Sequence, residues 1–407
     1  MDQRIEFVMK ALNHPNFGEL CRAYGISRKT GYKWRERFVS HGLDGLGEHS
    51  RRPHGHAGQL GEDLVCQILR LKHAHPHWGP RKLRELHRRL HRGAEPPSES
   101  SFKRVLAKAG LTEPRRRRPA RPGGRLAQGI RAQAPNDVWS VDFKGWWRDP
   151  TGRRIEPLSV RDEYSRMVLE LRAVPDGRSE TVRACFEELF RRHGLPGAIR
   201  SDNGPPFASA NGLLGLSRLS AWWLALGIHL ERSRPGCPQD NGAHERLHRD
   251  VRRELQAGRV GRNQPAFEQW RQEFNTERPH EALQLATPAE VYRPSDRAYE
   301  GTPEALDYQG RETRRVGGDG QIRFRSRPVL ISAALAGWDV ALGEQREERI
   351  ELWFASLLLG HLHADTLSFR PILPGASGPV AASAPLRRPP GRPAVTPISH
   401  PKTNPNL

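Results

Sequence analysis

Residues 138–173 read VWSVDFKGWWRDPTGRRIEPLSVRDEYSRMVLELRA and begin with a strand-like pattern. Ser140 and Asp142 fall on the same face of the predicted first strand, because side chains alternate between the two faces of a sheet. A carboxylate among apolar neighbours is costly to bury unless it is paired, hydrogen-bonded or bound to a metal. Asp142 is therefore a candidate functional residue.

Working outward from this stretch, the pattern alternates between strands and amphipathic helices. The order is three strands, a helix, a strand, a helix, a strand and a helix. The strands are expected near residues 138–143, 155–161, 167–173, 198–200 and 228–231, and the first helix near residues 179–193. This order predicts an α/β domain over residues 135–296.

Two more acids accompany Asp142 in this domain. Asp202 follows a short strand and precedes Asn203 and Gly204, whereas Glu245 lies on a helix whose expected buried stripe is Leu247, Val251 and Leu255. Three carboxylates from two strands and a helix can hold two Mg²⁺ ions, an arrangement suited to phosphodiester displacement. Oxygen ligands favour Mg²⁺ or Mn²⁺ over zinc. Asp240 is a competing third acid.

The charge of the chain is concentrated at its N-terminus. The 407 residues include 66 Lys and Arg against 46 Asp and Glu, a net charge of +20, and the first 134 residues carry +16 of it (28 basic against 12 acidic). Such a basic segment indicates nucleic-acid binding. The sequence has no apolar run of about 18 residues and no secretory signal. We therefore expect a cytoplasmic protein.

Residues 18–38, GELCRAYGISRKTGYKWRERF, have the layout of a helix-turn-helix. Gly25 provides a turn, and Ser27 is a favourable N-cap for a second, basic helix. An ordinary helical hairpin is the alternative. In a helix-turn-helix the second helix enters the major groove of DNA. The residues expected to contact DNA are Arg28, Lys29, Thr30 and Lys33.

Four motifs occur in a fixed order: VWSVDF, IRSDNGPPF, RPGCPQDNGAHERLHR and FNTERPHEALQLATPAEVY. Together they resemble the integrase catalytic core of bacterial insertion-sequence transposases, which are related to retroviral integrases. GISRKTGYKW also resembles the helix-turn-helix of these transposases. The resemblance covers about residues 15–295 and is weaker over 300–370. It implies a ribonuclease H-like fold, with a mixed sheet flanked by helices, and a small C-terminal β-barrel.

The resemblance also implies an Asp-Asp-Glu triad that maps onto Asp142, Asp202 and Glu245, as catalytic residues and as ligands of two Mg²⁺ or Mn²⁺ ions per site. The implied activity is cutting and joining of DNA ends at terminal inverted repeats, by hydrolysis and strand transfer. The partner is double-stranded DNA, bound by a homo-oligomer. Further DNA contacts are expected from Arg249, Arg252 and Arg253. One departure is the 42-residue interval between Asp202 and Glu245, whose excess falls in residues 208–219.

Composition and resemblance together predict six segments. These are a helix-turn-helix DNA-binding domain (1–55), a second helical DNA-binding domain (56–112), a basic linker (113–134), an integrase catalytic core (135–296), a small β-rich domain (297–370) and a disordered Pro-rich tail (371–407).

Two other functions are compatible with parts of the sequence. His244-Glu245-Arg246-Leu247-His248 matches the HExxH signature of zinc hydrolases. However, the helix is flanked by arginines, and no further histidine follows before His280. We expect His244 and His248 to lie near the edge of the core, where they at most support the metal ligands or pack against the core. The second alternative is a DNA-binding protein whose catalytic core is silent.

Overall fold

The computed structural model describes six ranges of the chain, 2–48, 60–93, 95–112, 129–234, 242–256 and 263–372. Most of the predicted basic linker, nearly all of the predicted Pro-rich tail and Asp240 lie outside these ranges. The chain divides into two compact units, Met1–Cys66 and Gln67–Leu407, which we describe separately.

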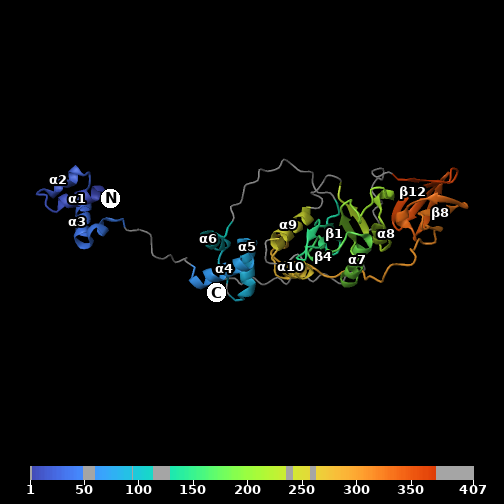
Figure 1. Cartoon of the computed structure of the whole chain (residues 1–407), viewed down its shortest axis with the longest axis horizontal. Helices are drawn as coiled ribbons and strands as arrows, with labels where there is room; N and C mark the ends of the chain where they lie inside the picture. The colour runs from blue at the N-terminus through green and yellow to red at the C-terminus, as the bar shows by residue number, and fades with distance from the viewer. Residues whose placement is uncertain are drawn as a thin grey trace, which may run out of the picture. The chain divides into compact units, whose positions relative to one another are not determined.

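The first unit is a small helical domain (Figure 1). It comprises α1 (Asp2–Ala11), α2 (Phe17–Ala23), α3 (Arg28–His41) and the 3-10 helix η1 (Gly42–Leu46). Gly25 has φ +67°, which glycine adopts without strain. Ser27 caps α3, because its side chain accepts a hydrogen bond from the Thr30 backbone N–H at 3.1 Å. Helix α2, this turn and α3 form the expected helix-turn-helix around buried Leu20, Cys21 and Trp34.

Three helices follow: α4 (Glu62–Ala74), which spans the boundary between the two units, and α5 (Pro80–Leu90) and α6 (Glu99–Lys108), which belong to the second unit. Ile68 of α4 and Leu83 of α5 are completely buried, as their helical spacing predicts. Leu90 lies on the same face of α5 as Leu83, but its side chain is 61% exposed. It is the last residue of α5, so no following turn of the helix covers it.

The centre of the second unit is a mixed sheet. Its strands are β1 (Val138–Phe143), β2 (Trp147–Arg148), β3 (Arg154–Asp162), β4 (Val168–Val174), β5 (Ala198–Ser201) and β6 (His229–Arg232). Strand β3 pairs antiparallel with β1, β2 and β4, whereas β5 is parallel to both β1 and β6. The lateral order is therefore β4-β3-β1-β5-β6. With the helices between them, these strands follow the predicted ribonuclease H-like order; the short β2 was not predicted.

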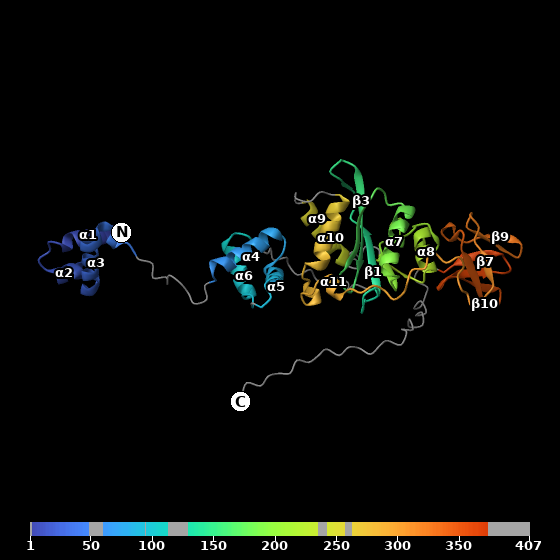
Figure 2. The same ribbon diagram turned by 90° about the horizontal axis from the view of Figure 1, so that it is seen from below.

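Helices cover both faces of this sheet (Figure 2). Helices α7 (Ser179–His193) and α8 (Arg218–Ala225) pack on one face, where Trp139 and Phe186 belong to one apolar core. Helices α9 (Gly242–Gln256) and α10 (Gln264–Thr276) pack on the other face. Because side chains alternate along β1, Ser140 and Asp142 point to the α9 side. The predicted stripe of α9 is buried there, formed by Leu247, Val251 and Leu255.

The C-terminal part is rich in strands but is not a closed barrel. After η4 (Glu281–Leu283) and α11 (Pro288–Val291) come β7 (Thr313–Arg315), β8 (Gln321–Phe324), β9 (Arg327–Leu330), η5 (Ala333–Leu335), β10 (Asp339–Arg346), β11 (Arg349–Phe354), β12 (Leu357–His363) and β13 (Ser368–Pro371). Five strands form an open sheet in the order β13-β12-β11-β10-β7, and β8 pairs with β9 alone.

The expectation of a small C-terminal β-barrel is therefore not confirmed, because the sheets in the described residues are open. The β8–β9 hairpin lies beside both edge strands, β7 and β13, but no ladder joins them in the described residues. Strand β7 is only three residues long, and Pro328 and Pro371 lack the N–H that a ladder needs. Instead the hairpin and the sheet enclose an apolar core that includes Ile322, Val329 and Leu352.

Helix α8 and the segment before it join this β-rich part to the catalytic core. The segment 208–219, where the sequence has its excess residues, contains the short helix η2 (Leu213–Gly215). Leu216 and Leu224 pack into the core of the β-rich part, whereas Trp222 and Trp223 pack into the core under the sheet. Within the described ranges, no helix combines the length and apolar character needed to cross a membrane.

Candidate active site at the ends of β1 and β5

The carboxyl ends of two neighbouring strands carry the first two predicted acids. Strands β1 and β5 are parallel, and Ser140 pairs in register with Arg200. Two residues further along each strand, the same register brings Asp142 level with Asp202. Because neighbouring strands lie about 4.8 Å apart, the two carboxyl groups belong to one site.

A tight turn holds Asp202 at this edge. Its Oδ1 accepts a hydrogen bond from the Gly204 backbone N–H at 3.1 Å, and its side chain is exposed. A Cβ at position 204 would lie 3.1 Å from Oδ2 of Asp202, so a larger residue would press on the carboxylate. The Asn203 side-chain amide donates to the Ser233 carbonyl oxygen at 2.7 Å. Asn203 and Gly204 thus shape the loop that presents Asp202.

Glu245 reaches the site from the first turn of α9. Its side chain is exposed, and it lies on the opposite side of α9 from the buried stripe. Its charge acts on Asp142: burial, together with the negative charges of Asp202 and Glu245, raises the pKa of Asp142 to about 7. Asp202 and Glu245 are therefore both close enough to Asp142 to repel its carboxylate electrostatically.

The donor set of these acids suits a divalent metal ion. In the ranges that the structure describes, no three Asp, Glu, His or Cys side chains are grouped tightly enough to hold an ion as they stand. Nevertheless, the carboxylate of Asp142 is half-buried, and burial and the charges of two neighbouring acids raise its pKa. A cation bound beside it would therefore lower the electrostatic free energy of the site. The oxygen-only ligands match the preference of Mg²⁺ and Mn²⁺.

The predicted DNA-contact residues lie on two surfaces. On α9, Arg249, Arg252 and Arg253 are exposed on the side that also carries Glu245. Lys144, which sequence reasoning did not select, belongs to the same surface, because burial lowers its pKa and the charges of Arg252 and Asp142 act on it in opposite directions.

The second surface is the start of α3, where Lys29 and Lys33 are exposed. Arg28 is exposed too, although its guanidinium lies against Gly18 of α2, so it also packs the two helices together. Thr30 is only partly exposed, and its hydroxyl lies 2.9 Å from Ser27 Oγ within the cap of α3. These positions leave Lys29 and Lys33 as the two residues most available to a ligand.

The two histidines of the HExxH motif are buried beneath the acids. Nε2 of His244 and Nε2 of His248 lie 3.0 Å and 2.9 Å from the hydroxyl of Ser159 on β3. Nδ1 of His244 lies 2.9 Å from the hydroxyl of Ser140 on β1, whose proton goes to Glu163 Oε1 at 2.5 Å. Burial lowers the pKa of His244 to about 3 and that of His248 to about 2. A zinc hydrolase would need these ring nitrogens for its metal, whereas here they bind serines.

Sequence reasoning missed Ser140, Ser159 and Glu163 as partners of these histidines. Ser140 shares a strand face with Asp142, which the sequence shows. Ser159 stands opposite Asp142 only because of the antiparallel register of β1 and β3, which no local motif encodes.

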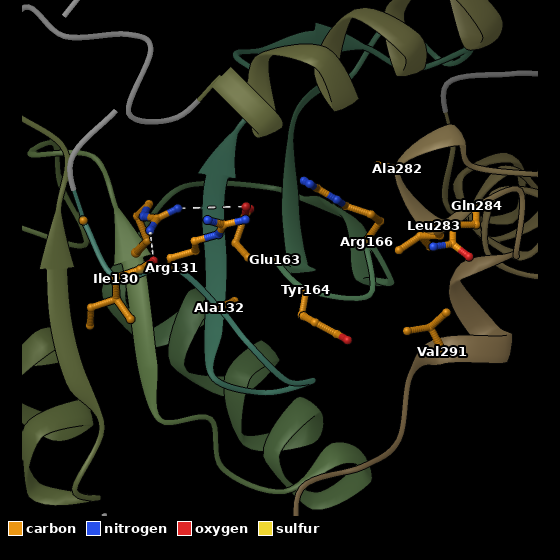
Figure 3. Close-up of a pocket in the computed structure, with 12 residues that line it drawn as sticks. Ile130, Arg131, Ala132, Glu163, Tyr164, Arg166, Ala282, Leu283, Gln284 and Val291 are labelled. Carbon is orange, nitrogen blue, oxygen red and sulfur yellow. Dashed lines mark hydrogen bonds and ion pairs between the residues drawn. The ribbon is translucent and has the colours of Figure 1, made fainter. Parts of the chain in front are cut away.

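A pocket of about 680 Å³ is lined by none of the three acids (Figure 3). Glu163 and Arg166 come from the end of β3 and the turn after it, and Ala282, Leu283 and Gln284 form the wall across from them. Arg200 lines the same pocket and pairs with Glu231 at 3.0 Å. Glu163 donates its backbone N–H to the Val138 carbonyl oxygen at the start of β1, whereas Asp142 lies near the end of that strand, so the pocket is separate from the three acids.

Comparison with known proteins finds domain families that match the N-terminal helices and the mixed-sheet domain. Residues 132–238 and 226–288 match integrase core domains, residues 3–54 match a helix-turn-helix domain and residues 30–106 match a homeodomain-like domain. The chain is thus a protein that combines helix-turn-helix domains with an integrase core domain.

Its curated relatives include proteins of bacterial insertion elements. It is 29% identical to an uncharacterized 31.7 kDa protein of insertion element IS407 from Burkholderia multivorans, over 60% of this chain and 86% of the relative. It is 28% identical to the transposase for insertion sequence element IS904 from Lactococcus lactis, over 40% of this chain and 64% of the relative. Among solved structures, the catalytic core domain of BIV integrase is 25% identical over 39% of this chain and 93% of that chain, with a TM-score of 0.31.

Proposed function

We propose that this protein is the transposase of an insertion element, which cuts and joins DNA ends at the terminal inverted repeats of that element. The observation that carries the proposal is the convergence of Asp142, Asp202 and Glu245 from β1, the end of β5 and the start of α9. Helix-turn-helix domains on the same chain supply DNA binding, and the relatives from insertion elements point to the same class of substrate.

The three acids are the proposed catalytic residues and the proposed ligands of two Mg²⁺ or Mn²⁺ ions. Bound there, such ions supply Lewis-acid stabilisation of the attacking and leaving oxygens in an in-line phosphodiester displacement. Asp142, half-buried and fixed in β1, is the most rigid of the three. Asp202 and Glu245 are exposed and can accommodate the approach of a DNA phosphate.

The proposed reaction has two displacements at one site. In the first, water attacks a phosphodiester at the end of the element and releases a 3′-hydroxyl. In the second, that hydroxyl attacks a phosphodiester of the target DNA, so the bond broken in one strand is replaced by the bond that joins the two DNAs. Neither displacement needs a covalent bond between the protein and DNA.

DNA would be held by two basic surfaces. Arg249, Arg252 and Arg253 would contact phosphates beside the acids, while Arg28, Lys29, Thr30 and Lys33 would contact the terminal repeat from α3. Joining both ends of an element requires at least two active sites, so the working form would be a homo-oligomer on DNA. Its substrates are chromosomal, and the protein would therefore work in the bacterial cytoplasm at the nucleoid.

The test uses the DNA that flanks the gene. Duplexes that carry the inverted repeats found there are incubated with the whole protein and Mg²⁺, and strand products are resolved on a denaturing gel. We expect cutting at the repeat end and joined products that depend on metal and on Asp142. Products that persist in the Asp142→Asn protein, or repeat duplexes that are cut no faster than scrambled duplexes, would contradict the proposal.

A further inference from the structure

Beneath the three acids, a chain of polar side chains connects α9 to two strands. In order, it runs from Glu163 to Ser140 of β1, then to His244 of α9, Ser159 of β3 and His248 of α9. Each link is between 2.5 and 3.0 Å long. Ser140, Ser159 and His244 are completely buried, so these links are sheltered from water.

The number of protons on each group decides which side chain donates and which accepts in each of these hydrogen bonds. Glu163 can only accept, so Ser140 donates its one proton to it, and His244 must donate from Nδ1 to Ser140. A neutral His244 then accepts at Nε2 from Ser159, and Ser159 accepts the Nε2 proton of His248. The Ser159 hydroxyl also lies 3.1 Å from the carbonyl oxygen of Asp142, which is the other acceptor within its reach.

This series of hydrogen-bonded side chains reaches two of the acids, Glu245 through the backbone of α9 and Asp142 through its side chain. His244 is the residue before Glu245 in the first turn of α9. At the other end, Nδ1 of His248 has no proton left to hold and lies 3.9 Å from Oδ2 of Asp142. The links therefore fix the height and rotation of α9 relative to β1, and with them the separation of Glu245 from Asp142.

We propose that His244 and His248 are positioning residues that clamp α9 to β1 and β3 so that Glu245 and Asp142 can share a divalent metal ion. This inference rests on the proposed function, because it assumes that the acids bind metal. The clamp, defined as Glu163, Ser140, His244, Ser159 and His248, matters because a metal site needs its ligands held by a hydrogen-bonded outer layer. A buried pair that served packing alone would not need four hydrogen-bonded links in sequence.

The two histidines differ in how well glutamine can replace them. His248 uses only Nε2 within the clamp, and a glutamine amide can place a donor near that position. His244 uses both ring nitrogens, and no single amide reaches Ser140 and Ser159 together. The clamp therefore predicts that His248→Gln is tolerated better than His244→Gln.

The experiment measures Mn²⁺ binding to the whole DNA-free protein by the loss of the free-ion paramagnetic resonance signal, with thermal unfolding as a second readout. Asp142→Asn identifies the Mn²⁺ that belongs to the acids. We expect that His248→Leu weakens this binding by about tenfold, His248→Gln by no more than about twofold, and His244→Gln by an intermediate factor. His193→Leu is the control, because His193 is also a largely buried histidine but packs against Trp139 and Tyr292, away from the acids.

The outcomes separate the two proposals. If Asp142→Asn leaves Mn²⁺ binding unchanged, the proposed metal site itself is wrong, and the clamp falls with it. If Asp142→Asn removes the binding while both histidine-to-glutamine variants bind like the original protein, the histidines serve packing alone and only the clamp is wrong. Should His248→Leu fail to fold, the order of the two glutamine variants still decides, because equal binding by both contradicts the clamp.

Discussion

At the scale of single residues, the three acids differ in their surroundings but share one electrostatic site. Asp142 is fixed in a strand, whereas Asp202 and Glu245 are exposed at a turn and at the start of a helix. Amide replacements keep the shape of each side chain and remove the charge that a metal ion requires.

We expect Asp142→Asn, Asp202→Asn and Glu245→Gln each to reduce DNA cutting and joining by at least about a thousandfold, since the metal-dependent electrostatic contribution is large. Binding of the repeat duplex should stay within about threefold, because the helix-turn-helix lies in a different unit. Gel-shift and cutting assays on the same preparations measure both. Asp240→Asn is the matched control and should remain active; an inactive Asp240 variant beside an active Glu245→Gln would reassign the third acid.

Asp142 should also affect stability in a way that depends on pH. Its pKa rises to about 7 in the folded protein. Between its ordinary value and pH 7, the folded state retains a proton that the unfolded state has lost, so stability falls as the pH rises through this window. Above pH 7 the whole penalty is present, and it is absent below about pH 4.

Asp142→Asn should therefore raise the free energy of unfolding at pH 8 without metal, by an amount on the order of 2 kcal/mol. Denaturant unfolding at pH 8 and at pH 4, with a chelator present, tests this. The gain should disappear at pH 4. A variant that is less stable than the original protein at pH 8 would show that Asp142 is not under electrostatic strain.

At the scale of elements, α3 is the basic helix on which repeat recognition should depend. Lys29 and Lys33 are exposed near its start, and their loss should remove phosphate or base contacts. We expect the double variant Lys29→Ala, Lys33→Ala to weaken repeat binding by at least about tenfold and to lower the salt slope of binding by about two. Lys10→Ala is the control, because Lys10 of α1 is paired with Glu6 at 2.7 Å. Equal effects of both variants would indicate a non-specific charge effect.

Several elements could be predicted from the sequence because their signals are local. The cap at Ser27, the buried stripe of α9 and the order of strands and helices in the core all follow from spacing within about 15 residues. The β-barrel was predicted from resemblance and is not confirmed, because the closure of a barrel depends on pairing between distant short strands, which no local signal encodes. The clamp could not be predicted either, since it requires the register of β1 against β3 and the rotation of α9 above both.

At the scale of the whole molecule, buried histidines should make the second unit sensitive to acid. Burial lowers the pKa of His193 to about 4, of His244 and His280 to about 3 and of His248 to about 2. Below pH 6.5 the unfolded state binds protons that these folded rings do not, so stability is lost as the pH falls. Asp142 and Asp162 act in the opposite sense, because burial raises the pKa of each.

Because the four histidines outnumber these two acids, we expect a net loss of stability between about pH 6.5 and 4. Thermal unfolding at half-unit steps of pH measures it. The slope against pH should become smaller in His193→Gln, which removes one of the four rings without touching the clamp. A midpoint that stays constant or rises between these pH values would contradict the expectation.

The burial of α8 on two sides determines what happens to a protein that is truncated at its C-terminus. All seven residues from Leu219 to Ala225 are buried, because Trp222 and Trp223 face the sheet while Ala221, Leu224 and Ala225 face the β-rich part. A premature stop codon after Glu245 would keep all three proposed catalytic acids yet uncover one whole side of this helix. Such a truncated product would expose a continuous apolar surface and aggregate, so decay of the 3′ end of the gene would silence the element even though every catalytic codon survived.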